Sequence, residues 1–180
     1  MKNRTGLLPD IDSIRLIPKT KWKVKGTIHN ATKTTPLGYN KQFSKWVARV
    51  RKDVLKTDAS LLWFWRLENK DTLNVGGVRW HLHFILGGDN LALELAQGDK
   101  FFRALEKVWP VKCNAKIEAY VIEHPSNADW NEYINKPSPY DANETHTKFS
   151  PMLVKEVRRI RKRMALEKKE EAKKKEMFVF

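Results

Sequence analysis

The chain has 180 residues, enough for one domain with a substantial core plus an extension, and its single cysteine excludes an internal disulfide framework and a cysteine-based zinc site. It carries 35 Lys and Arg residues against 21 Asp and Glu, a net charge of +14. This charge favours a polyanionic partner such as DNA, RNA or an acidic membrane surface, without choosing among them.

The first half of the chain passes from a strand pattern to a helix pattern. Residues 1–20 show no sustained period and are interpreted as a lead-in. Residues 21–29 alternate, with Thr27 and His29 opposite an apolar face, which predicts a strand. Residues 30–40 are predicted to form a loop. From about Lys41, apolar residues at spacings of three and four predict a helix.

Two apolar segments follow, and they predict an antiparallel hairpin. Residues 60–68 and 78–86 are rich in aromatic and large aliphatic side chains. A turn-like link with paired glycines, residues 69–77, lies between them.

The remaining elements are a helix, a strand, a short helix and a charged tail. A helix is predicted over 91–109, where Gly98 would split it, and its inner face would carry Leu91, Leu95, Phe102, Leu105 and Val108. Residues 115–123 alternate cleanly and predict a strand. A short helix would begin at Ser126 or Asn127 and end at Pro137.

This order of elements predicts an α+β domain with a central antiparallel β-sheet flanked by helices, close to a ferredoxin-like or split βαβ plan. We assign residues 1–20 to the lead-in, 21–150 to the domain and 151–180 to a basic C-terminal helix or tail. The tail is expected to be an exposed helix or a partly disordered arm. DNA contact and a merely solvated surface are both open for it.

Two histidines on the second hairpin strand are the main candidates for chemistry. Residues i and i+2 of a strand share a face, so His81 and His83 project together and could chelate one divalent ion. A short pair of this kind is also found as hydrogen-bonded histidines on a partly exposed sheet. If the link is centred on Asn74–Val75 or on Val75–Gly76, Glu68 lies opposite His81 or His83. Two imidazoles and a carboxylate suit Mg²⁺ or Mn²⁺, and could also hold Zn²⁺.

A tyrosine and a lysine further along the chain could complete such a site. Tyr133 and Lys136 stand at i and i+3 and therefore share a helix face. A phenol becomes a useful nucleophile beside a metal-polarised phosphodiester, and a neighbouring ammonium favours the phenolate. Alternatively, Trp130, Tyr133 and Ile134 form the buried side of a short helix.

These motifs together resemble the HUH endonuclease superfamily, in particular its single-tyrosine initiators of rolling-circle replication (Rep proteins). "HLH" at 81–83 is similar to the family's histidine–hydrophobe–histidine on a central strand, and "YINK" at 133–136 to its tyrosine helix. "GTIHN" at 26–30 resembles an upstream family motif loosely, and Glu68 matches the place of a third metal ligand. The resemblance covers roughly residues 20–140.

The resemblance implies a nicking and rejoining reaction. His81, His83 and Glu68 would bind Mg²⁺ or Mn²⁺, and Tyr133 would attack single-stranded DNA at the hairpin origin of a plasmid, phage or virus. The products would be a 5′-phosphotyrosine link and a free 3′-hydroxyl, with Lys136 supporting the tyrosine or the phosphate. The sequence has no phosphate-binding G-x-x-x-x-G-K-[ST] loop, so either a host helicase and polymerase are the expected partners or the chain is a nuclease fragment of a longer protein.

Several basic residues could contact DNA outside the nicking site. The basic candidates for DNA contact are Lys21, Lys23, Lys25, Arg49, Arg51, Lys52 and Arg79, and a solvated edge strand explains the first three equally well. No apolar segment is long enough for a signal peptide or a membrane span, so we expect a cytoplasmic protein, or a nuclear one if it comes from a eukaryotic virus. The rival functions are a non-catalytic nucleic-acid-binding domain and a metal phosphoesterase that uses water as its nucleophile.

Overall fold

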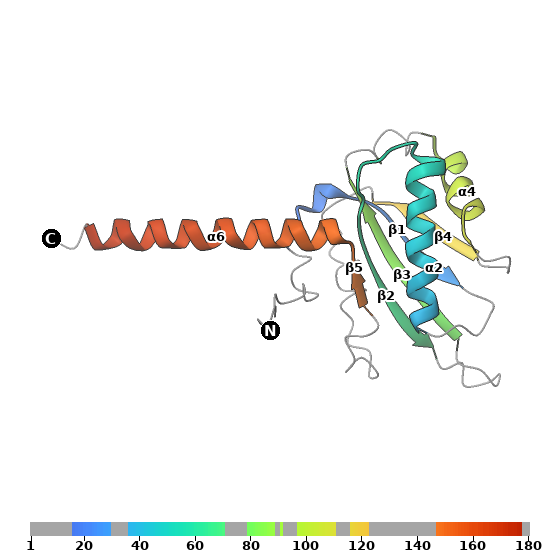
Figure 1. Ribbon diagram of the computed structural model, residues 1–180, viewed down its shortest axis with the longest axis horizontal. Coiled ribbons are helices and arrows are strands. Elements are labelled where there is room, and N and C mark those ends of the chain that lie inside the picture. The colour runs from blue at the N-terminus through green and yellow to red at the C-terminus, as the bar shows by residue number, and fades with distance from the viewer. Residues whose placement is uncertain are drawn as a thin grey trace, which may run out of the picture.

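The computed structural model describes residues 16–29, 36–70, 79–88, 91, 97–110, 116–122 and 147–177. They form an α+β structure in which a five-stranded antiparallel sheet has the strand order β4-β1-β3-β2-β5 (Figure 1). The strands are β1 (Trp22–His29), β2 (Leu62–Lys70), β3 (Arg79–Gly87), β4 (Lys116–Val121) and β5 (Thr147–Phe149). The helices are α2 (Pro36–Arg49), α4 (Asp99–Lys107) and α6 (Pro151–Met177), with the short turns η1 (Lys19–Lys21) and η2 (Val50–Val54).

The predicted hairpin is present, and its register is one of the two expected. β2 and β3 pair so that Leu62 lies opposite Gly87 and Glu68 lies opposite His81. This is the register of a link centred on Asn74–Val75. Each strand both begins and ends one or two residues later in the chain than predicted. Their position in the sheet makes β3 the central strand of the five.

The first face of the sheet is covered by α2, η2 and α4. Large apolar side chains fill the space between them, among them Tyr39, Phe43, Trp46, Trp65, Leu82, Phe84, Phe101 and Leu105. The indole nitrogen of Trp46 donates a hydrogen bond to the carbonyl oxygen of Leu105 (2.8 Å), which ties α2 to α4. Leu82, Phe84 and Leu86 of β3 therefore face this core, at the spacing of two expected for one face of a strand.

Helix α2 begins earlier than the sequence analysis placed it. Residues 36–40 were predicted to be loop, and this prediction was wrong. Proline is favoured at the first position of a helix, where its missing N–H has no partner to lose. Tyr39 then joins Phe43 and Trp46 in one buried stripe at spacings of four and three, so the extra turn extends the same apolar face.

The phase of α4 also differs from the prediction. Phe101 is buried with Leu105, whereas Phe102, the residue predicted to face inwards, is only partly buried. The helix begins at Asp99, after Gly98 adopts a φ of 52°, a left-handed conformation that suits glycine. Because α4 begins after this glycine, the direction of its buried face does not follow from the residues before Gly98. Phe101 and Leu105, at i and i+4, form that face.

The second face of the sheet is apolar only towards one end, where the first turns of α6 pack on it. Leu153, Val157 and Ile160 of α6 meet a cluster from the sheet and from the segment before β1, namely Ile17, Trp22, Leu62, Phe64 and Ile85. Ser150 caps the helix, since its hydroxyl oxygen accepts a hydrogen bond from the N–H of Leu153 (3.0 Å). The same oxygen accepts the N–H of Trp63 (3.2 Å), which anchors the start of α6 to β2.

Candidate functional site

Polar residues occupy the rest of this second face in two rows that cross the strands. Residues directly opposite one another in antiparallel strands share a face, so each row can be read from the register. The first row runs Lys116, His29, His81 and Glu68, and the second runs Glu118, Thr27, His83, Arg66 and Thr147. Both predicted histidines therefore lie among polar residues from neighbouring strands, on the face opposite α2.

His83 is buried and held by a hydroxyl from β1. Only 3% of His83 is exposed, and its Nδ1 lies 2.9 Å from the Oγ1 of Thr27. An imidazole that binds a metal through one nitrogen normally donates the other N–H to an oxygen. If Nδ1 of His83 carries the proton and donates to Thr27, Nε2 is the ring nitrogen that carries the lone pair. Thr27 thus has the position of a residue that orients this histidine.

His81 is half-buried and stacks against a third histidine. The rings of His81 and His29 have centroids 4.7 Å apart and planes at 90°, an edge-to-face contact. On its other side, His29 Nε2 lies 3.6 Å from Glu118 Oε2. His29 and Glu118 were not singled out as site residues from the sequence. Their alternation placed each on a polar strand face, but only the strand order brings β1 between β3 and β4.

The third predicted ligand, Glu68, has the expected place in the sheet. Its backbone is paired with that of His81, although its side chain lies outside the described residues. Among the side chains that the structure describes, no three His, Cys, Asp or Glu groups are arranged to hold a metal ion. The metal site of His81, His83 and Glu68 therefore stays a prediction, and its two imidazoles and one carboxylate are donors that Mg²⁺ and Mn²⁺ accept.

The second row also contains a buried cation. Arg66, which was not singled out as a site residue from the sequence, is 3% exposed and is paired in register with His83. A guanidinium keeps its charge in a protein, so this side chain places a permanent positive charge on β2 next to the histidine strand. The predicted nucleophile Tyr133 and its neighbour Lys136 lie outside the described residues, as does the nearby Tyr140.

Comparison of the chain with protein-family models, with curated proteins and with solved structures finds no match. In the part of the chain that the structure describes, no helix combines the length and the apolar character needed to cross a bilayer. The function is therefore inferred from the geometry of the sheet.

The predicted DNA-contact residues fall into separate places. Lys25 is on the same face of β1 as Thr27, opposite Ile85 in the register, whereas Lys23 lies where the pairing of β1 with β3 shifts register, between Trp22 and Val24. Arg49 and Lys52 belong to α2 and η2, on the opposite side of the sheet from the histidines. Arg79 lies in β3, and its side chain is outside the described residues.

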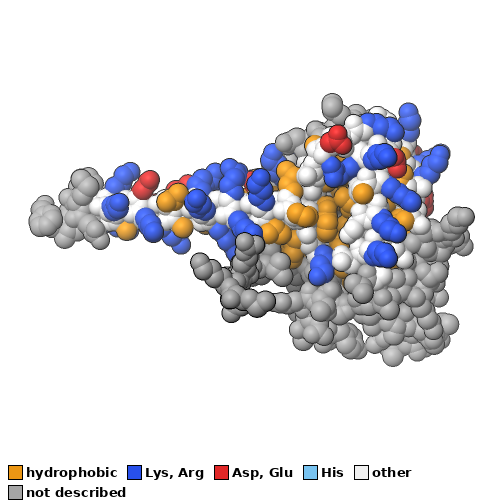
Figure 2. Space-filling view, viewed as in Figure 1, with side chains coloured by type: hydrophobic (Ala, Val, Ile, Leu, Met, Phe, Trp, Pro, Cys, Tyr) orange, Lys and Arg blue, Asp and Glu red, His pale blue; other side chains and the backbone are white. Residues whose placement is uncertain are grey.

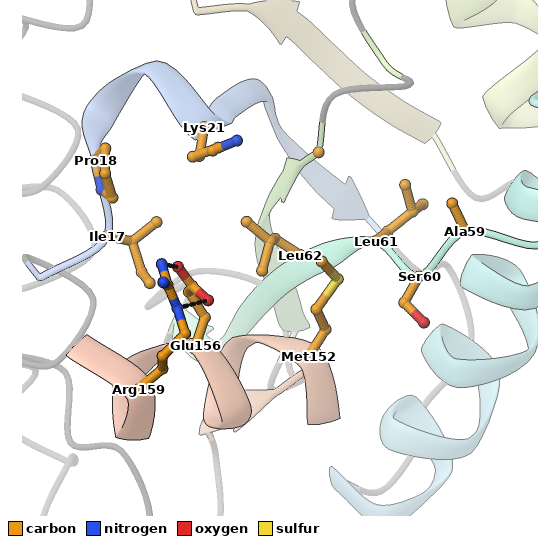
Figure 3. A pocket seen from close by; sticks show the side chains of 11 residues that line it. Ile17, Pro18, Lys21, Ala59, Ser60, Leu61, Leu62, Met152, Glu156 and Arg159 are labelled. Carbon is orange, nitrogen blue, oxygen red and sulfur yellow. Dashed lines mark hydrogen bonds and ion pairs between the residues drawn. The ribbon is translucent and has the colours of Figure 1, made fainter. Parts of the chain in front are cut away.

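Lys21 lies in η1 and lines a hollow of about 320 Å³ at the far end of β3 from the histidines. The hollow lies between η1, the beginning of β2 and the first turns of α6, where Glu156 and Arg159 form an ion pair with an N–O distance of 2.7 Å (Figure 3). The hydrogen bond and charge of Arg159 lower the pKa of Glu156, against the opposing effect of burial. With one ion pair and mostly apolar walls, this hollow lacks the titratable cluster of the polar rows.

Proposed function

We propose that the chain is a metal-dependent DNA endonuclease and strand transferase of the HUH type, which nicks single-stranded DNA through a phosphotyrosine intermediate. The strand order supports this proposal. In the order β4-β1-β3-β2, with α2 between β1 and β2 and α4 between β3 and β4, the sheet follows a ferredoxin-like, split βαβ plan, and β5 extends it at one edge.

One observation carries the proposal more than any other. His81 and His83 project from the central strand onto a polar face, and the neighbouring strand places Glu68 directly opposite His81. The pairing of Glu68 with His81 is one of two registers considered from the sequence, and a register slip of one residue would have sent Glu68 to the other face. The hydrogen bond between Thr27 and His83 adds a partner of the type that ligating histidines have.

The residues would divide the reaction between them. His81, His83 and Glu68 would hold Mg²⁺ or Mn²⁺, which when bound would polarise the scissile phosphate. Tyr133 would lose its phenolic proton and form a new O–P bond, while the P–O bond to the 3′-oxygen breaks and that oxygen takes a proton. Lys136 would favour the phenolate of Tyr133 by its positive charge. The 3′-hydroxyl could then prime synthesis, and its return attack on the phosphotyrosine would rejoin the strand.

One observation favours a second candidate, a non-catalytic nucleic-acid-binding domain. Both histidines have partners within the sheet, since His83 bonds Thr27 and His81 contacts His29. Histidines satisfied in this way can be purely structural. This candidate predicts that Tyr133→Phe changes no activity.

The test is a covalent-capture experiment with a pool of single-stranded DNA of random sequence, because the origin sequence is unknown. The full chain is incubated with the labelled pool and Mn²⁺ and then run on a denaturing gel. We expect a band of protein carrying DNA, and mass spectrometry should place the nucleotide on Tyr133. Sequencing of the captured DNA would give the preferred site.

Three variants make the result specific. Tyr133→Phe should abolish the adduct, while the matched control Tyr140→Phe should keep it. His81→Ala should abolish the adduct but leave binding of the single-stranded pool within about twofold, because the imidazole would act in the reaction rather than in affinity. An adduct that survives in Tyr133→Phe, or its absence from the wild-type chain with both Mn²⁺ and Mg²⁺, would refute the proposal.

A further inference from the structure

The distal part of α6 extends away from the sheet as a single helix (Figure 1). Its first turns pack through Leu153, Val157 and Ile160, but every residue from Arg161 to Lys175 is exposed. After Ile160 the helix contains only strong helix formers, without Gly, Pro or β-branched residues. The sequence thus builds a helical arm that is exposed to solvent beyond its base.

The charges of this arm are unusually concentrated. Between Lys155 and Lys175 there are eleven Lys and Arg residues and four Glu, a net charge of +7 and half of the +14 carried by the whole chain. Lys and Arg side chains are visible along much of the arm (Figure 2). Because a helix rises about 1.5 Å per residue, these charges lie along about 30 Å.

The charges are also sorted around the helix axis. At about 100° per residue, eight of the eleven cations lie within an arc of about 160°, which we call the basic side. They are Lys155, Arg158, Arg161, Lys162, Lys168, Lys169, Lys173 and Lys175. The four glutamates lie on the opposite arc, the acidic side. Two of the three cations there are paired, Arg159 with Glu156 at 2.7 Å and Arg163 with Glu167 at 3.6 Å.

We propose that the basic side of the α6 arm binds the phosphate backbone of duplex DNA, with the helix lying in the major groove. A helix of this diameter, about 10–12 Å, fits a B-form major groove about 12 Å wide, whereas the major groove of A-form RNA is too narrow and deep. The arm has no aromatic residue between Lys155 and Lys175 on which bases of a single strand could stack. Its contacts would therefore be electrostatic and independent of base sequence.

The pattern of apolar residues on the arm argues against two other binding partners, a second copy of the chain and a lipid surface. The apolar stripe of Val157, Ile160 and Met164 continues into Glu167, Glu171 and Lys174, so the arm lacks the seam that a second copy would need for a coiled coil. Beyond Arg161 the apolar residues are few and point to different sides of the helix. They form no continuous face that could enter a lipid surface.

Two double variants test the proposal, each removing two positive charges from the exposed arm. Lys162→Gln with Lys169→Gln removes them from the basic side. The matched control, Arg163→Gln with Lys174→Gln, removes them from the acidic side. Glutamine has a helix propensity close to that of lysine and arginine, so both variants should keep the helix, which circular dichroism would check.

Binding is measured by fluorescence anisotropy with a labelled duplex of random sequence, at several salt concentrations and in EDTA so that no metal-dependent cleavage occurs. We expect the basic-side variant to bind the duplex about tenfold more weakly or worse at low salt, and its slope of log K against log salt to fall by about 1.8. The control variant should stay within about threefold of the wild type.

Equal losses in both variants, no loss in either, or a basic-side loss seen equally with single-stranded DNA would overturn the proposal. Basic-side-dependent binding to vesicles containing phosphatidylserine, with none to the duplex, would assign the arm to a membrane and overturn it as well. The proposal goes beyond nicking. A failed nicking assay with intact duplex binding would refute only the proposed function, and the converse result would refute only the role of the arm.

Discussion

The two faces of the sheet are built from the same strands but differ in composition, one being apolar and the other largely polar. In β3, Leu82, Phe84 and Leu86 enter the aromatic core beneath α2 and α4, while His81 and His83 enter the polar rows. One face is closed by helices, and the other is closed by α6 only towards one end. Because successive strand residues point to opposite sides, each strand can stabilise the fold with one set and supply chemical groups with the other.

The largest loss of stability is expected for a substitution on the face that the helices cover. Phe84 is fully buried, and its ring centroid lies 5.0 Å from that of Trp46. Phe84→Ala should lower the free energy of unfolding by about 3–5 kcal/mol, because it loses apolar burial and leaves a cavity. Urea denaturation measures this loss. A change below 1 kcal/mol would mean that the core is looser than the packing indicates.

A smaller loss is expected at Gly26, on the same face. A Cβ at this position would lie 2.4 Å from the carbonyl oxygen of Glu118 and 2.6 Å from the ring of Phe84. Gly26→Ala should therefore cost about 1–3 kcal/mol through overpacking, measured in the same way. Gly98→Ala is the control, since no atom lies within 4 Å of its Cβ position and only its positive φ opposes the change.

On the polar face the expected effect shifts from stability to ligand binding. Thr27→Val keeps the shape of the side chain but removes the partner of His83 Nδ1, and should cost about 1 kcal/mol. If the proposed site binds Mn²⁺, the ion should raise the melting temperature of the wild type, and Thr27→Val should reduce that rise because His83 is no longer oriented. Thr57→Val, in the turn before β2, is the control. An unchanged Mn²⁺ effect in Thr27→Val would remove Thr27 from the site.

The smallest effect is expected at the apolar end of the second face, where Glu156 pairs with Arg159. The lowered pKa of Glu156 means that its ion pair stabilises the fold above the ordinary value of 4.5. That contribution is lost as the pH falls through the lowered pKa. Glu156→Gln should thus lower the urea midpoint slightly at pH 7 and less at pH 3. An equal shift at both pH values would show that charge is not the cause.

The local pattern of the sequence determined much of this molecule. Alternation in 21–29 and the apolar composition of 78–86 predicted the strands. For a link centred on Asn74–Val75 or on Val75–Gly76, Glu68 was expected opposite a histidine, and the first of these registers is present. These features depend on neighbours along the chain, where a period of two leaves little choice of face. Helix phase at Gly98 and the early start of α2 were misjudged, because a single glycine or proline resets the local geometry.

Only the tertiary structure decided which strands lie beside the predicted β2–β3 hairpin. The contact of His81 with His29, the bond of His83 to Thr27 and the burial of Arg66 all require β1 and β2 to flank β3. The tertiary structure also decided that the first turns of α6 are buried while the rest of the helix is exposed. Leu153 and Val157 pack on an apolar patch that forms only when the sheet is assembled. Contacts between residues far apart in sequence depend on strand order, which local periodicity does not encode.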